Sequence, residues 1–119
     1  RANHHLRKRI VLHVTSSRPH SHALIKAPGG TVSAGWALTN SGADPATVEY
    51  SLWRMSPIVR RLATGPLINI PPGQTINVFH AVTWLVPNEP GIAMVALIID
   101  QVFAAEALVA SHNFTVDIR

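Results

Sequence analysis

The chain has 119 residues, 47% of them hydrophobic and 13% charged, with a formal net charge of +4 and no cysteine. This length suits one globular domain, and the lack of cysteine excludes thiol chemistry and cysteine-ligated zinc. The longest apolar stretch, residues 91–99, is far shorter than the roughly 20 residues that cross a bilayer, and no basic-then-apolar leader opens the chain. We therefore expect a soluble chain without a membrane span.

The positive charge is concentrated at the start of the chain. Residues 1–26 hold six basic residues, five of the seven histidines and no acidic residue, whereas residues 27–119 hold four basic residues against six acidic ones. A basic terminal segment is typical of an interaction tail, although a solvated tail without a partner would have the same composition. We predict a basic, histidine-rich arm over residues 1–22 and a folded domain over residues 23–119.

The first predicted strands are short, and a longer one follows them. Residues 10–14 and 23–27 are β-branched runs, and the second is closed by a Pro-Gly-Gly turn. From Thr31 apolar and polar residues alternate, as in a strand with one buried face. The residues predicted to face the core there are Val32, Ala34, Trp36 and Leu38.

A second alternating strand follows the loop over residues 40–45. It places Val48, Tyr50 and Leu52 in the core, and Trp53 breaks the alternation, which predicts a bulge or the rim of the sheet. The next two pieces, residues 58–62 and 67–70, are bounded by prolines. Proline confines such pieces to edges and strand starts, so we expect two short peripheral strands.

The last third of the chain is also read as strands. Residues 75–86 alternate as one strand with His80 in the middle of its apolar face, which predicts a buried histidine. Residues 92–99 are apolar throughout, as in a central strand covered on both faces. Residues 102–110 have helical propensity and predict a loop or short helical turn before a final strand over residues 112–118.

Turn clusters that separate about seven short strands every 8 to 12 residues predict an all-β chain. The expected architecture is an immunoglobulin-like antiparallel β-sandwich of about seven strands with an extended basic N-terminal arm. No second copy of the pattern occurs, so we expect one module.

Several turns carry a resemblance to a known family. An Asn40-Ser41-Gly42 turn follows Trp36–Thr39, Pro71–Thr75 form a Pro-Gly turn before a long strand, and Pro90-Gly91 lead a strand that ends at Ile99-Asp100, ahead of Glu106 and His112-Asn113. Over about residues 32–118 this pattern resembles the CARDB type of bacterial immunoglobulin-like domain. The chain departs from it at residues 103–110, where an alanine-rich segment replaces an acidic, asparagine-rich run. The resemblance implies a non-catalytic spacer or binding module of surface and secreted proteins, and similar sandwiches decorate virus particles.

The histidines are the first candidates for chemistry. His20 and His22 would point to one side of an extended segment, and His4 and His5 could add ligands for zinc, copper or nickel. No acidic or cysteine partner lies nearby in the sequence, and surface histidines without a metal are commoner, so we predict no metal or cofactor. The chain also has no nucleophile elbow, paired acids or phosphate loop, so we predict that it is not an enzyme.

A second cluster combines Trp53 with Arg54, Arg60 and Arg61. Such a group could stack on a base or a sugar ring, although the solvated face of an edge strand explains it equally well. Few charged residues cover the domain, and many outward strand positions are apolar, which predicts exposed apolar surface of the kind that marks protein contacts.

We therefore predict a non-enzymatic structural or interaction module that packs against other protein subunits in a larger assembly. A virion shell or tail decoration and a bacterial surface layer or filament fit equally, which places the chain outside the cell, on its surface or on a virion. The arm would dock on a neighbouring subunit, with contact to an anionic surface or a nucleic-acid backbone left open. Its predicted contact residues are Arg7, Lys8, Arg9 and Arg18.

Two alternative functions remain open. One is a secreted adhesin-type module that binds a glycan or a protein through the Trp53 and arginine cluster. The other is a histidine-rich metal-binding protein.

Overall fold

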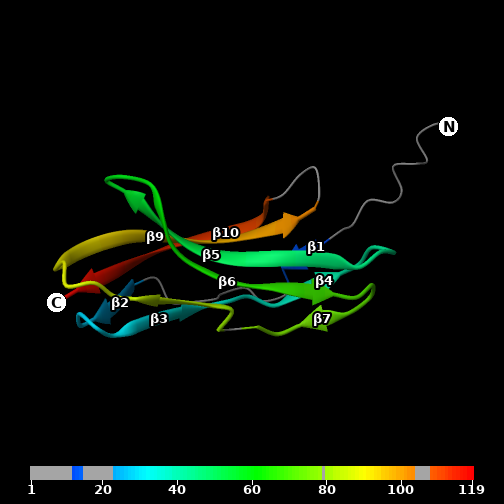
Figure 1. Cartoon of the computed structure of the whole chain (residues 1–119), viewed down its shortest axis with the longest axis horizontal. Coiled ribbons are helices and arrows are strands. Elements are labelled where there is room, and N and C mark those ends of the chain that lie inside the picture. Colours follow the sequence, from blue (N-terminus) through cyan, green and yellow to red (C-terminus); the bar gives the residue numbers. More distant parts are fainter. Residues whose placement is uncertain (1–11, 15–22, 79, 104–107) are drawn as a thin grey trace.

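The computed structural model describes residues 12–14, 23–78, 80–103 and 108–119, which form strands and no helix (Figure 1). No helix that could cross a membrane occurs in this part of the chain. The all-β prediction is confirmed. The strands are β1 (Leu12–Val14), β2 (Ala23–Lys26), β3 (Thr31–Ala34), β4 (Leu38–Asn40), β5 (Ala46–Ser56), β6 (Arg60–Ile70), β7 (Thr75–Ile76), β8 (Val82–Leu85), β9 (Gly91–Val102) and β10 (Leu108–Ile118).

The four longest strands form most of one curved sheet. Its order is β2-β10-β9-β5-β6, and every pair is antiparallel except β2 and β10, which run parallel. This parallel pair departs from the predicted antiparallel arrangement. The other strands form two smaller sheets, β1-β4-β7 and β3-β8, and β3 and β7 lie along the lower edge of the molecule in Figure 1. Residues 12–14 of the predicted arm thus pair with β4 of the same chain.

One hydrophobic cluster joins the large sheet to the smaller ones. Alternate side chains of β5, β9 and β10 point into it, as a strand with one buried face requires. The predicted core residues of the first half of the chain are confirmed, because all are buried. They are Val32, Ala34, Trp36, Leu38, Val48, Tyr50 and Leu52.

Asn40 fixes the end of β4 from inside this core. Its side chain is fully buried, and its amide nitrogen donates hydrogen bonds to the carbonyls of Asp44 at 2.8 Å and Ile70 at 2.9 Å. Its side-chain oxygen accepts one from the backbone N–H of Gly42 at 2.9 Å. Both functional groups of the amide are therefore used, and they tie the loop after β4 to the end of β6.

Several predicted elements differ from the observed ones, and the residues that the structure describes form ten strand segments, where about seven strands were expected. The alternating run from Thr31 is interrupted after Ala34, and the run over residues 75–86 is interrupted after Ile76. Residues 77, 78, 80 and 81, between β7 and β8, are not strand, so the alternation of faces does not apply there. His80 is exposed, and the prediction that it is buried is wrong.

The two peripheral pieces predicted over residues 58–62 and 67–70 are one strand, β6. It does lie at the edge of the sheet, as predicted. A register shift between β5 and β6 lies beside Gly65-Pro66, so the irregular backbone there is accommodated without ending the strand. The register also shifts between Leu52 and Trp53, where the bulge or rim was predicted, and the extra residue at this shift is Leu62 of β6.

The strand predicted over residues 92–99 is central in the sheet, as expected, but it is not covered on both faces. β9 lies between β10 and β5, yet Ile92 and Met94 on its outer face are 65% and 44% exposed. Between β9 and β10 the residues 104–107 lie outside the described part. Of the loop or helical turn predicted over residues 102–110, residue 102 belongs to β9 and residues 108–110 belong to β10, so the prediction is wrong at these positions.

Candidate binding site at the β5–β6 hairpin

The hairpin formed by β5 and β6 brings the predicted basic-aromatic cluster together. Trp53 on β5 lies opposite Arg61 on β6, and Arg54 lies opposite Arg60. Residues directly opposite each other on antiparallel strands have Cβ atoms about 5 Å apart, so the two side chains of each pair lie close together. Successive residues of a strand point to opposite faces, so the Trp53–Arg61 pair and the Arg54–Arg60 pair lie on opposite faces of the hairpin. The sequence placed these residues near each other, and the register shows how they are paired.

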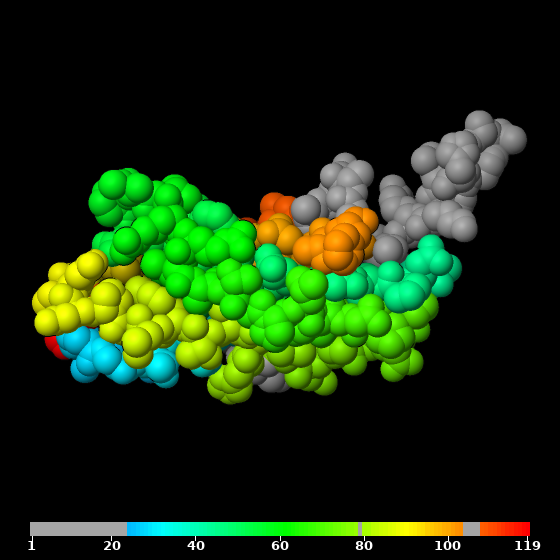
Figure 2. Space-filling view, in the orientation of Figure 1, coloured from blue at the N-terminus to red at the C-terminus, as the bar shows by residue number. Residues whose placement is uncertain are grey.

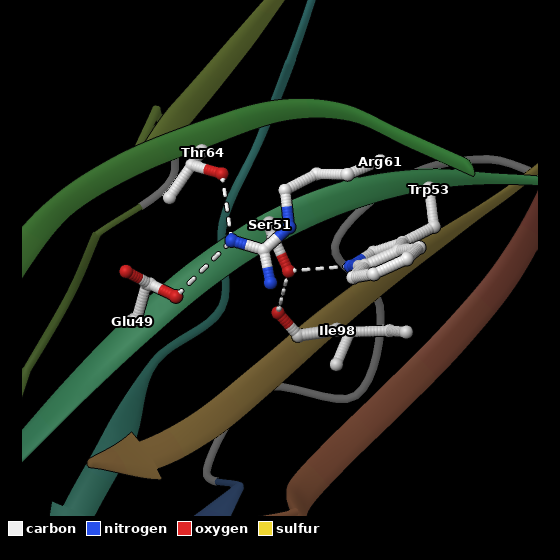
Figure 3. A network of polar contacts seen from close by, with 6 residues as sticks. All are labelled: Glu49, Ser51, Trp53, Arg61, Thr64 and Ile98. Carbon is white, nitrogen blue, oxygen red and sulfur yellow. Dashed lines mark hydrogen bonds and ion pairs between the residues drawn. The ribbon is translucent and has the colours of Figure 1, made fainter.

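Trp53 and Arg61 belong to a polar network on the sheet surface (Figure 3). The guanidinium carbon of Arg61 lies 4.8 Å from the centre of the indole ring, within the range of a cation–π contact. The indole N–H donates to the Ser51 hydroxyl at 2.8 Å. One ring face and the single polar atom of Trp53 are thus already in use.

Arg61 is held from its other side by two polar groups of the same hairpin. One of its terminal nitrogens donates to the Thr64 hydroxyl at 3.1 Å and lies 3.5 Å from a carboxylate oxygen of Glu49 (Figure 3). Its charge is therefore compensated within the network. These contacts make Trp53 and Arg61 a fixed surface element of the sheet.

Arg54 and Arg60 have a different environment at the end of the hairpin. Both approach one carboxylate oxygen of Glu89, at 3.7 Å for Arg54 and 4.0 Å for Arg60. Glu89 comes from the turn between β8 and β9. Two positive charges thus share a single negative one.

A pocket opens beside these two arginines. Its volume is about 340 Å³, and it is lined by Arg54, Pro57, Ile58 and Arg60. The lining combines two guanidinium groups with two apolar side chains at the hairpin turn. Such a combination can bind a small anion that carries an apolar group.

Glu89 is the residue of this site that sequence reasoning missed. It lies 29 positions after Arg60 in a turn of the Pro-Asn-Glu-Pro-Gly type, which by itself signals only a change of direction. The pairing of β5 with β9 brings the start of β9 beside the end of β5. That long-range pairing has no local signal in the sequence.

The other candidate residues are not gathered at this hairpin. The arm residues Arg7, Lys8, Arg9 and Arg18 and the histidines His4, His5, His20 and His22 lie outside the described residues. Within the described ones, no three histidine, aspartate or glutamate side chains come close enough to hold a metal ion. His112 packs against aromatic rings, with its ring centre 5.7 Å from that of Trp36 and 6.2 Å from that of Phe114.

Comparison with known proteins places the fold but no family. No family model and no curated protein matches the chain. The structure is similar to part of a β-glucosidase from Listeria innocua, solved in complex with glucose, with a TM-score of 0.54 at 11% identity, over 92% of this chain and 16% of that one. It also matches part of a family 123 glycoside hydrolase from Clostridium perfringens, with a TM-score of 0.42 at 10% identity, over 82% of this chain and 23% of that one. At such identity the first likeness shows a shared fold alone.

Proposed function

We propose that the chain is a non-enzymatic, immunoglobulin-like β-sandwich module that packs against other protein subunits in a larger assembly. The observation that carries this proposal is a group of exposed large apolar side chains at one end of the five-stranded sheet. We call this group the hairpin-end patch. It consists of Ile25, Met55, Ile58, Val59, Ile92 and Met94, which are 40% to 72% exposed.

The sheet register supports the view that these side chains form one surface. Ile25 of β2 and Ile92 of β9 both lie opposite Asp117 of β10, one on each side, and Met94 lies opposite Ser56 of β5. The β5–β6 hairpin stands out from the surface beside the start of β9 (Figure 2). Contiguous apolar surface of this kind is unfavourable in water and usually marks a protein contact.

The surroundings of the patch also fit a protein partner. Asp117 in its middle is paired with Arg119, whose terminal nitrogen lies 3.0 Å from its carboxylate. Apolar side chains around compensated charges are typical of protein–protein interfaces. A fold that makes up 16% of a longer chain in the β-glucosidase is in line with a module of a larger protein. A virion or a cell surface remains the proposed location.

The arm is proposed to make a second contact. Because residues 12–14 pair with β4 of their own chain, residues 1–11 are the part we assign to a neighbouring subunit. Their basic residues Arg7, Lys8 and Arg9 would meet an acidic surface there.

The test is the mass of the full chain in solution by light scattering, measured over a range of concentrations. We expect oligomers that dissociate on dilution, and a shift to monomer at 1 M NaCl, where the charges of the arm are screened, when Ile92→Thr and Met94→Thr are combined, because threonine retains β-propensity without the apolar surface. Leu85→Thr is the matched control, because Leu85 is 66% exposed on β8, away from the patch. An equal effect of the control, or a monomer at every concentration, would remove self-packing through this patch.

A further inference from the structure

Arg54 and Arg60 form an unusual pair for a hairpin. They lie directly opposite each other on β5 and β6, and like charges in that position destabilise the strand pair. A negative charge between them offsets this repulsion. Within the described part of the chain, one carboxylate approaches both of them, that of Glu89.

Glu89 compensates the two arginines incompletely. Its distances of 3.7 Å and 4.0 Å exceed the 2.7 to 2.9 Å that is typical of a direct charge-assisted hydrogen bond. Its side chain is 59% exposed, so solvent competes with both ion pairs. Arg54 donates from its Nε to the Ser56 carbonyl at 2.9 Å, so this hydrogen bond does not use the two terminal nitrogens of the guanidinium. Donor capacity and one net positive charge remain at the site.

The burial of Arg54 makes an incoming anion more favourable there. Its side chain is only 21% exposed, against 55% for Arg60. An ion pair is screened less where water has less access, so an anion gains more beside Arg54 than on open surface. The pocket of about 340 Å³ lies at these two arginines, and Pro57 and Ile58 form its apolar part.

We propose that this pocket is a binding site for a monoanionic carboxylate that carries a short aliphatic group, such as the C-terminal carboxylate of a peptide with an apolar last residue. The carboxylate binds between Arg54 and Arg60, because the planar guanidinium matches carboxylate geometry. The aliphatic group packs on Pro57 and Ile58. One net positive charge at the site calls for one negative charge on the ligand. Ile58 belongs both to this pocket and to the hairpin-end patch, so self-packing would compete with the ligand. The titration is therefore run on the Ile92→Thr and Met94→Thr variant, in which the two proposals can fail separately.

The test is a titration of the full chain with N-acetylleucine, followed by the NMR shifts of the backbone amides of the hairpin. The neutral N-acetylleucinamide is the probe without the charge, and glucuronate is a carboxylate on a polar sugar ring. We expect saturable binding of N-acetylleucine with a Kd on the order of 1 mM, as suits a small ligand. We expect weaker binding of both other probes.

Substitutions of the two arginines and of Glu89 should change the affinity for N-acetylleucine in opposite directions. Arg54→Gln and Arg60→Gln should each weaken binding of N-acetylleucine by about tenfold, which is the effect of losing one charge-assisted hydrogen bond. Glu89→Gln should strengthen it several-fold, since it removes the competing carboxylate. The matched control is Glu49→Gln, which removes an acid that faces Arg61 instead and should leave the Kd unchanged.

Three results would overturn the proposal. The first is that binding of N-acetylleucine does not saturate at concentrations up to 20-fold above the expected Kd. The second is that the neutral N-acetylleucinamide binds as tightly as N-acetylleucine. The third is that Glu49→Gln strengthens binding as much as Glu89→Gln, which would indicate a general charge effect. Binding of glucuronate as tight as that of N-acetylleucine would refute the aliphatic part of the assignment. Ile58→Ser, at a 72% exposed position where folding is not at stake, checks that part directly and should weaken N-acetylleucine more than acetate.

Discussion

Tyr50 is the single tyrosine of the chain, and its hydroxyl lies in the core, where it donates to the Trp36 carbonyl at 2.6 Å. Burial raises the pKa of this hydroxyl well above its ordinary value of 10.0. In the unfolded chain Tyr50 ionises near pH 10, while in the folded protein it stays neutral. Its contribution to stability is therefore complete below pH 10 and is lost as the pH rises from there toward the folded pKa. We expect the free energy of unfolding to fall by about 1.4 kcal/mol between pH 9 and pH 11 from this group.

Urea unfolding at the two pH values measures this loss, and absorbance of tyrosinate near 295 nm reports on Tyr50 alone. Absorbance should appear only with unfolding. Tyr50→Phe is the control: it should cost about 1 kcal/mol at pH 7, from the loss of the hydrogen bond to the Trp36 carbonyl, and lack the tyrosine share of the alkaline loss. Ionisation of Tyr50 in a protein that remains folded would contradict this account.

At the scale of elements, the edge strand β6 depends on a glycine. A Cβ built on Gly65 would lie 2.0 Å from the carbonyl oxygen of Ala81, which belongs to the backbone segment just before β8. Backbone on both sides of the contact cannot move aside as a flexible side chain would. We expect Gly65→Ala to lower the free energy of unfolding by about 1 to 3 kcal/mol, in the range of overpacked sites. Urea unfolding measures it, with Asn69→Ala as the control at an exposed position of the same strand.

A Gly65→Ala variant as stable as the Asn69→Ala control would mean that β6 can move away from Ala81 at little cost. The close approach would then not be needed to hold the edge strand.

The strands that could be predicted are those whose alternation runs unbroken against the core. Val48, Tyr50 and Leu52 are such a case. The register of β5 with β6 shifts beside Trp53, but the extra residue lies on β6. His80 was misplaced because it lies between β7 and β8, where the chain is not a strand and the alternation of faces does not apply. Gly65-Pro66 predicted the end of a strand, but β6 continues through them. A shift in the register between β5 and β6 accommodates the irregular backbone at these two residues. Such shifts are tertiary and leave no local pattern.

The candidate site was predictable to a similar extent. Trp53, Arg54, Arg60 and Arg61 are close in sequence across one turn, so their grouping follows from a hairpin. The hairpin does not show which acid compensates each arginine, because Arg61 meets Glu49 of the same hairpin while Arg54 and Arg60 depend on Glu89 from another turn.

For the whole molecule, the separation of charge from apolar surface gives two contacts with different dependence on salt. The hairpin-end patch is apolar, and its association is not weakened by salt, whereas the basic arm relies on charges that are screened within about 3 Å at 1 M ionic strength. We expect the association of the full chain, measured by sedimentation velocity, to weaken between 0.05 M and 1 M NaCl.

Replacing Arg7, Lys8 and Arg9 together by glutamine should remove that weakening and leave a residual, salt-independent association. The Ile92→Thr and Met94→Thr pair should do the reverse and leave association only at low salt. An arm variant that retains the full salt dependence would show that the arm is not the source of the electrostatic contact.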